Sequence, residues 1–114
     1  MTLSRLASVW LPVVAWAALI FTFSSIPSLD SGLGGWDMLL RKCAHTLEYA
    51  IFGALLMRAL RVPIPAFAAG VAYAISDEWH QTFVSGRHGA VVDVAIDSFG
   101  VVLGVLAYVR LARR

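Results

Sequence analysis

The sequence predicts an all-α membrane protein, a single domain over residues 1–114 that forms a four-transmembrane-helix bundle with both termini cytoplasmic. Of the 114 residues, 60% are hydrophobic and 14% are charged. With Gly counted in place of Tyr, the apolar share exceeds the roughly 45–50% of soluble domains, and such a composition also excludes disorder. Four apolar spans of about 20 residues would use about 80 residues, so we expect no additional soluble domain.

The first predicted helix covers residues 6–24. Residues 6–29 carry no charge, and the apolar stretch is long enough to cross the hydrocarbon core of a bilayer. A cleaved signal peptide is the alternative, because Arg5 precedes the apolar stretch, but Ile26-Pro27-Ser28-Leu29 does not form a small-x-small cleavage site. We therefore expect a retained helix, followed by a loop rich in Gly and Pro over 24–35.

The second and third predicted helices cover residues 39–60 and 63–80. Proline is tolerated in the first turn of a helix but not in its interior, so the segment 62–65, which contains two prolines, ends one helix and starts the next. The charge-free part of the third helix ends at Ser76, which is short for a membrane span. Residues 77–80 must therefore also be helical or lie in polar space lined by protein.

The fourth predicted helix covers residues 90–109. It follows a turn at 85–89, which contains two glycines, and it is apolar except for Asp93, Asp97 and Ser98. Its length of about 20 residues is that of a membrane span.

The distribution of charge predicts the orientation of the bundle. In a four-span chain, both termini lie on the same side as the second loop. That side holds six of the nine basic residues and none of the seven acidic ones: Arg5, Arg58, Arg61, Arg110, Arg113 and Arg114. Short cytoplasmic loops are enriched in Lys and Arg, so this side is expected to be cytoplasmic. The carboxylates then belong to the extracytoplasmic half.

Polar side chains share one face on each of the last three helices, since successive residues of a helix are offset by about 100°. These residues are His45, Glu48 and Tyr49, then Asp77, Glu78, His80 and Gln81, then Asp93 and Asp97. An ionised group inside a bilayer costs about 2.5–3.5 kcal/mol on insertion scales, so such groups face a bundle interior or a water-filled cavity. Gly100 and Gly104 have the spacing that lets two membrane helices approach closely. We expect the three polar faces to converge at the outer end of the bundle.

Four motifs resemble the VanZ-like family over about residues 23–104. In order, they are Phe23-Ser24-Ser25, Lys42-x-x-His45-x-x-Glu48-Tyr49, Ser76-Asp77-Glu78-Trp79-His80-Gln81-x-Phe83-x-x-Gly86-Arg87 and Asp93-x-x-x-Asp97-x-x-Gly100. One departure is Ile26, where a polar residue is expected after the paired serines. The resemblance implies a small multi-pass bacterial membrane protein, in a family whose name-giving member is linked to resistance against glycopeptide antibiotics such as teicoplanin. It implies no particular reaction.

The residues permit an enzyme that acts at the outer face of the cytoplasmic membrane on a lipid-linked or cell-wall intermediate. The candidate catalytic residues are His45, Glu48, Tyr49, Asp77, Glu78, His80, Asp93 and Asp97, and the candidate substrate-binding residues are Lys42, Gln81 and Arg87. Imidazoles and carboxylates can exchange protons directly. They can also hold a divalent metal ion with a bound water, for which the candidate ligands are His45, Glu48, Asp77, His80 and Asp97.

Two other functions remain open on the sequence. The first is a non-catalytic binder or accessory protein that shields a cell-wall precursor or the antibiotic. The second is proton or ion transport, which is disfavoured because the cytoplasmic halves of the last three helices hold almost no ionisable group to complete a relay. The expected partners are the bilayer and an envelope intermediate, with no nucleic acid.

Overall fold

The computed structural model describes residues 2–25, 35–83 and 91–112, and within these ranges all regular structure is helical. The four helices are α1 (Leu3–Ser25), α2 (Gly35–Leu60), α3 (Pro63–Gln81) and α4 (Val91–Ala112). The prediction of an all-helical chain is confirmed. The predicted loop over 24–35 is too long, because Ser25 and Gly35 are also helical, and α2 begins at Gly35 instead of at the predicted residue 39. The turn expected at 85–89 lies outside the described residues.

The chain reverses direction between α2 and α3 over two residues. Arg61 has a φ of 65°, and its backbone N–H donates to the carbonyl of Met57 at 2.8 Å. Val62 is extended, and Pro63 is the first residue of α3. A proline fits this position because its fixed φ suits a helix and its missing N–H would have no intrahelical partner there. The same proline explains why α2 cannot continue.

Two of the helices are long and apolar enough to cross a membrane, judged by length and composition. They are the segment Leu3–Phe23 of α1 and the whole of α4, Val91–Ala112. Large apolar side chains on both helices face outward, including Leu11, Phe99 and Leu106. An exposed apolar surface of this kind is typical of a membrane or protein contact.

Helices α2 and α4 approach each other closely because glycines face the contact. A Cβ added at Gly100 would lie 2.5 Å from the carbonyl oxygen of Thr46, and one added at Gly104 would lie 2.6 Å from the carbonyl carbon of Ala50. No larger residue fits at such distances without moving the backbone. The predicted packing role of this glycine pair is confirmed, and the close approach turns Asp97, one turn before Gly100, toward the other helices.

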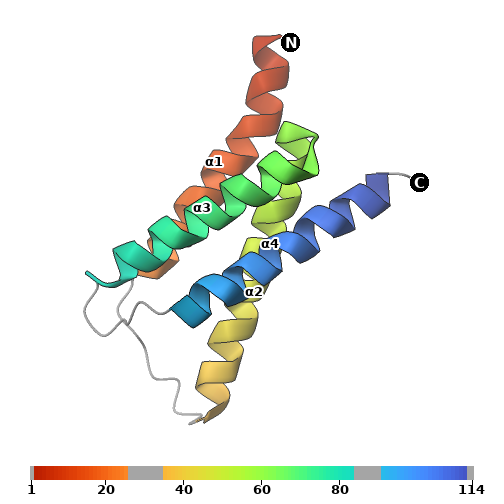
Figure 1. Ribbon diagram of the computed structural model, residues 1–114. Coiled ribbons are helices and arrows are strands. Elements are labelled where there is room, and N and C mark those ends of the chain that lie inside the picture. Colours follow the sequence, from red (N-terminus) through yellow and green to blue (C-terminus); the bar gives the residue numbers. More distant parts are fainter. Residues whose placement is uncertain (1, 26–34, 84–90, 113–114) are drawn as a thin grey trace.

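Helix α1 is held to the bundle by two aromatic side chains. The indole Nε1 of Trp16 donates to the carbonyl of Glu48 in α2 at 2.8 Å, and the hydroxyl of Tyr73 in α3 donates to the carbonyl of Ala17. Figure 1 shows α1 beside α3, with both termini toward the end of the molecule opposite the start of α2. The core that these helices enclose contains the fully buried side chain of Ile20.

Candidate functional site

Three helices each contribute one side chain to a compact polar group, which we call the three-residue cluster: His45 of α2, Asp77 of α3 and Asp97 of α4. Each offers a nitrogen or oxygen atom, and these atoms all lie within 4.8 Å of one another. The Nδ1 atom of His45 lies 3.7 Å from Oδ1 of Asp97. The structure therefore brings together one residue from each of the three polar faces that the sequence predicts.

Tyr49 lies one helical turn after His45 and closes the cluster on its α3 side. Its hydroxyl donates to Oδ2 of Asp77 at 2.8 Å. Tyr49 is fully buried, and Asp77 is 4% exposed. The second oxygen of Asp77, Oδ1, is buried and has no hydrogen-bond partner among the described residues. A buried acceptor without a partner lowers the stability of the folded protein, so this oxygen is a candidate to bind a ligand.

The cluster concentrates negative charge in the interior. Asp97 is 2% exposed, and its carboxylate is repelled by those of four other residues: Asp77, Glu78, Asp93 and Glu48. Buried carboxylates need a counter-charge or a proton, because removing an ionised group from water costs several kcal/mol. The site therefore requires a positively charged species or bound protons close to these oxygens.

Lys42 and Asp93 form an ion pair next to the cluster. The Nζ atom of Lys42 lies 2.9 Å from Oδ1 of Asp93. The side chains of the two residues are 41% and 34% exposed, respectively, so the pair lies near the surface. The sequence places Asp93 on one face with Asp97, but the structure pairs it with a lysine of α2.

The ring of His80 lies against α1. Its centroid is 4.4 Å from that of Phe21, and its Nδ1 atom is buried with no hydrogen-bond partner in the described part of the chain. His80 is therefore not a member of the three-residue cluster, although the sequence places it on the same face of α3 as Asp77. The contact with Phe21 gives no signal in the sequence, because it depends on how α1 is rotated against α3.

The remaining predicted site residues lie outside the three-residue cluster or outside the described part of the chain. Glu78 and Gln81 are buried in α3, and Glu48 is half-buried in α2. None of them belongs to the three-residue cluster. Arg87 lies outside the described residues. Of the five predicted metal-ligand candidates, the structure groups three.

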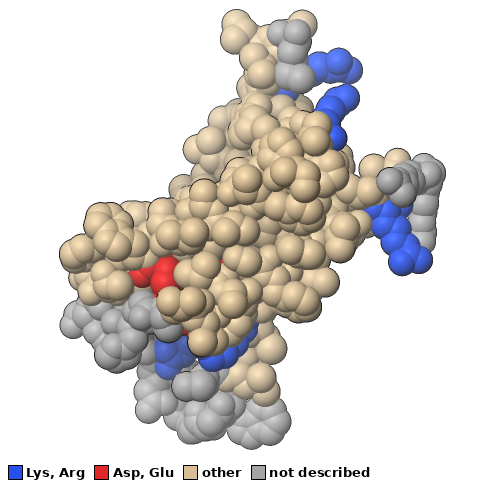
Figure 2. Space-filling view, in the orientation of Figure 1, with Lys and Arg blue, Asp and Glu red and all other residues tan. Residues whose placement is uncertain are grey.

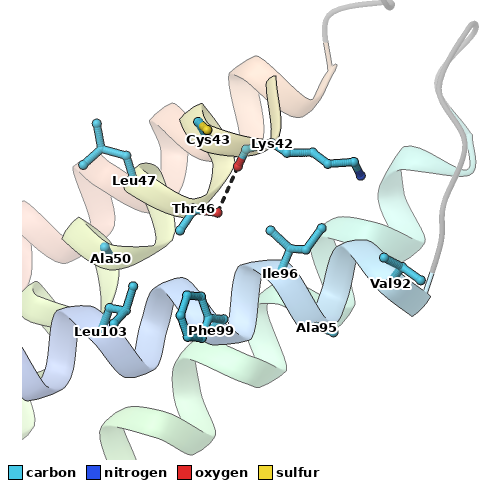
Figure 3. Close-up of a pocket in the computed structure, with 10 residues that line it drawn as sticks. All are labelled: Lys42, Cys43, Thr46, Leu47, Ala50, Val92, Ala95, Ile96, Phe99 and Leu103. Atoms are coloured by element: carbon cyan, nitrogen blue, oxygen red, sulfur yellow. Dashed lines mark hydrogen bonds between the residues drawn. The ribbon is translucent and has the colours of Figure 1, made fainter. Parts of the chain in front are cut away.

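An apolar groove of about 680 Å³ lies between α2 and α4, and no member of the three-residue cluster lines it. Figure 3 shows Leu47, Phe99 and Leu103 along the groove, with Lys42 extending over one end of it. This groove was not predicted from the sequence. The sequence feature that could have predicted the groove is a series of apolar or small residues, including Cys43, along the face of α2 beside its polar face.

Comparison with known proteins identifies a family. The family model described as VanZ/LLP1 matches residues 7–113, which is nearly the whole chain. No curated protein and no solved structure matches. The matched range includes all members of the three-residue cluster and the Lys42 and Tyr49 side chains beside it. The chain therefore belongs to the VanZ/LLP1 family.

Proposed function

We propose that this protein crosses the cytoplasmic membrane four times and is an enzyme, a hydrolase or transferase that acts on a lipid-linked or cell-envelope intermediate from the extracytoplasmic side. The observation that carries the proposal is the three-residue cluster, in which an imidazole and two carboxylates from three helices meet in the interior. Both direct proton exchange and metal-assisted activation of water use these groups. A link to glycopeptide resistance fits the family and an extracytoplasmic site.

Four membrane spans are supported by the way in which α2 and α3 place their polar groups. Asp77, Glu78 and Gln81 are buried, whereas Leu47 and Ile75 are more than half exposed. These two helices are less apolar overall because they contain polar residues. The polar residues named here face protein, as charged residues inside a membrane do. The lipid-facing surface that they would present is apolar.

The proposed orientation is supported by the separation of charge. In the view of Figure 2, basic side chains lie near both termini and also at the opposite end, whereas the acidic side chains in view lie only toward that opposite end. Near the termini, Arg58 donates to the backbone carbonyl of Ser8 at 3.0 Å. Both residues line a surface cavity, and Arg5 and Arg61 line it as well. Clustered Arg without acidic residues is typical of the cytoplasmic side.

A lipid-linked substrate is supported by the apolar groove. Thr46 and Leu47 line it, and the preceding residue on α2, His45, belongs to the three-residue cluster. A hydrocarbon chain in the groove, with its head group at the Lys42 end, would bring that head group to the Lys42–Asp93 ion pair, one helical turn before Asp97 of the cluster. Lys42, at the end of the groove, would attract an anionic phosphate as a charged hydrogen-bond donor.

The second candidate is a non-catalytic binder that holds or shields a cell-wall precursor or the antibiotic. It is favoured by the same groove, which needs no chemistry to hold an apolar chain. In this case, replacing a carboxylate by an amide should weaken binding by degrees without abolishing the effect.

The test measures lipid-linked envelope intermediates and teicoplanin susceptibility in cells that express the wild type or single variants. Asp77→Asn, Asp97→Asn and Glu48→Gln should abolish the change that the wild type causes, at equal levels of protein in the membrane. Asp37→Asn is the matched control, because eight residues at about 1.5 Å rise place it about 12 Å along α2 from His45. Full activity in all three amide variants contradicts an enzyme, and a graded loss favours the binder.

A further inference from the structure

We infer that His45, Asp77 and Asp97 bind a divalent transition-metal ion of the Zn²⁺ or Mn²⁺ class. The inference rests on the proposed function, since the ion would occupy the same site, and it names three ligands from the five candidates that the sequence offers. One imidazole and two carboxylates are a donor set that such ions accept.

The spacing of the donor atoms fits a shared ion. Two ligand atoms bound at about 2.1 Å in tetrahedral or octahedral geometry lie about 3.0–3.4 Å apart. The Nδ1 atom of His45 and Oδ1 of Asp97 are 3.7 Å apart, longer than a hydrogen bond and a few tenths of an ångström beyond that range. All three ligand atoms lie within 4.8 Å of one another, so modest side-chain movement would bring them onto one ion.

One carboxylate oxygen of Asp77 gives an independent reason for a ligand. Asp77 is only 4% exposed, and its Oδ1 atom has no hydrogen-bond partner within the described ranges. Its Oδ2 atom accepts a hydrogen bond from Tyr49 at 2.8 Å. Such a hydrogen bond from outside the metal's own ligands is the usual means of orienting a ligating carboxylate. An ion would satisfy this oxygen, which accepts no hydrogen bond from the described residues.

The charge of the site also favours a divalent ion. The cluster contains two buried carboxylates, and the carboxylates of Glu48, Glu78 and Asp93 add to the negative charge that acts on Asp97. One cation near the cluster, Lys42, is paired with Asp93 at the surface. A divalent cation would offset both cluster carboxylates at once. Its remaining coordination positions could take water or a phosphoryl oxygen of the substrate, and polarising such an oxygen is what these ions do in hydrolases.

The experiment uses the full chain in lipid nanodiscs, stripped with EDTA, dialysed against Zn²⁺ or Mn²⁺ and analysed for bound metal. We expect one ion per wild-type chain and a rise in Tm when the ion is added. His45→Ala and Asp97→Asn should weaken affinity at least about tenfold, since even second-sphere changes cost 10–100-fold. Asp77→Asn should do the same while keeping an oxygen that accepts the Tyr49 hydrogen bond. Asp37→Asn should bind as the wild type does.

The result that overturns the inference is wild-type binding no stronger than that of a His45→Ala/Asp97→Asn double variant, because any bound metal is then adventitious. Equal Tm values of the stripped wild type and variants would exclude misfolding as the cause of lost binding. The two proposals also fail differently. If turnover of an envelope intermediate persists in EDTA, the metal site is contradicted and the proposed enzymatic function stands. If the protein binds metal specifically but turns over no such intermediate, the metal site stands and the enzymatic function is contradicted.

Discussion

Replacing Tyr49 with Phe removes one hydroxyl from the interior. The hydrogen bond that this hydroxyl donates determines the expected loss in the free energy of unfolding. That hydroxyl donates to Oδ2 of Asp77 at 2.8 Å, and both residues are buried. Hydrogen bonds to charged groups contribute about 1.5–3 kcal/mol in soluble proteins, whereas interhelical ones in a membrane protein average about 0.6 and reach about 1.7 kcal/mol. Since the other oxygen of Asp77 has no partner among the described residues, we expect a coupling energy near the upper membrane value, about 1.5 kcal/mol.

The assay is a double-mutant cycle of Tyr49→Phe and Asp77→Ala, with the free energy of unfolding measured by SDS titration in mixed micelles containing EDTA. The fluorescence of the four tryptophans reports unfolding. Tyr108→Phe, the same chemical change near the C-terminal end of α4, is the control and should add independently to Asp77→Ala. A coupling energy below about 0.5 kcal/mol, the usual limit of additivity for independent sites, would refute the hydrogen bond as a significant link between α2 and α3.

Two further predictions concern the contacts of α4. Gly104→Ala should lower the free energy of unfolding by about 1–3 kcal/mol, the usual cost of overpacking, because the new Cβ would lie 2.6 Å from the carbonyl carbon of Ala50. Since Gly→Ala at an uncrowded helical site stabilises a protein, an unchanged or raised value in the same titration would mean that α2 and α4 are farther apart. Lys42→Met should cost at most about 1 kcal/mol, as partly exposed ion pairs do, and this cost should shrink in high salt. A salt-independent loss well above that value would show that the pair with Asp93 acts as a buried one.

The helices and their polar faces follow from the sequence because both are local properties. Apolar stretches long enough for helices, and the proline at 63, fix where the chain is helical and where it turns. A period of 3.6 residues fixes which side chains share a face, and it groups His45 with Tyr49. The membership of the VanZ/LLP1 family was likewise readable from motifs, since these are patterns of residue types along the chain.

The partners of each polar residue were decided by tertiary structure alone. The sequence fixes angles around each helix axis, but not how far one helix is rotated or shifted against the next. The glycines of α4 set that offset by allowing contact with the α2 backbone. As a result, Asp97 reaches His45, whereas Asp93, one turn earlier, meets Lys42. The ring of His80 packs on Phe21 of α1, because side-chain contacts between helices depend on packing geometry that no single helix encodes.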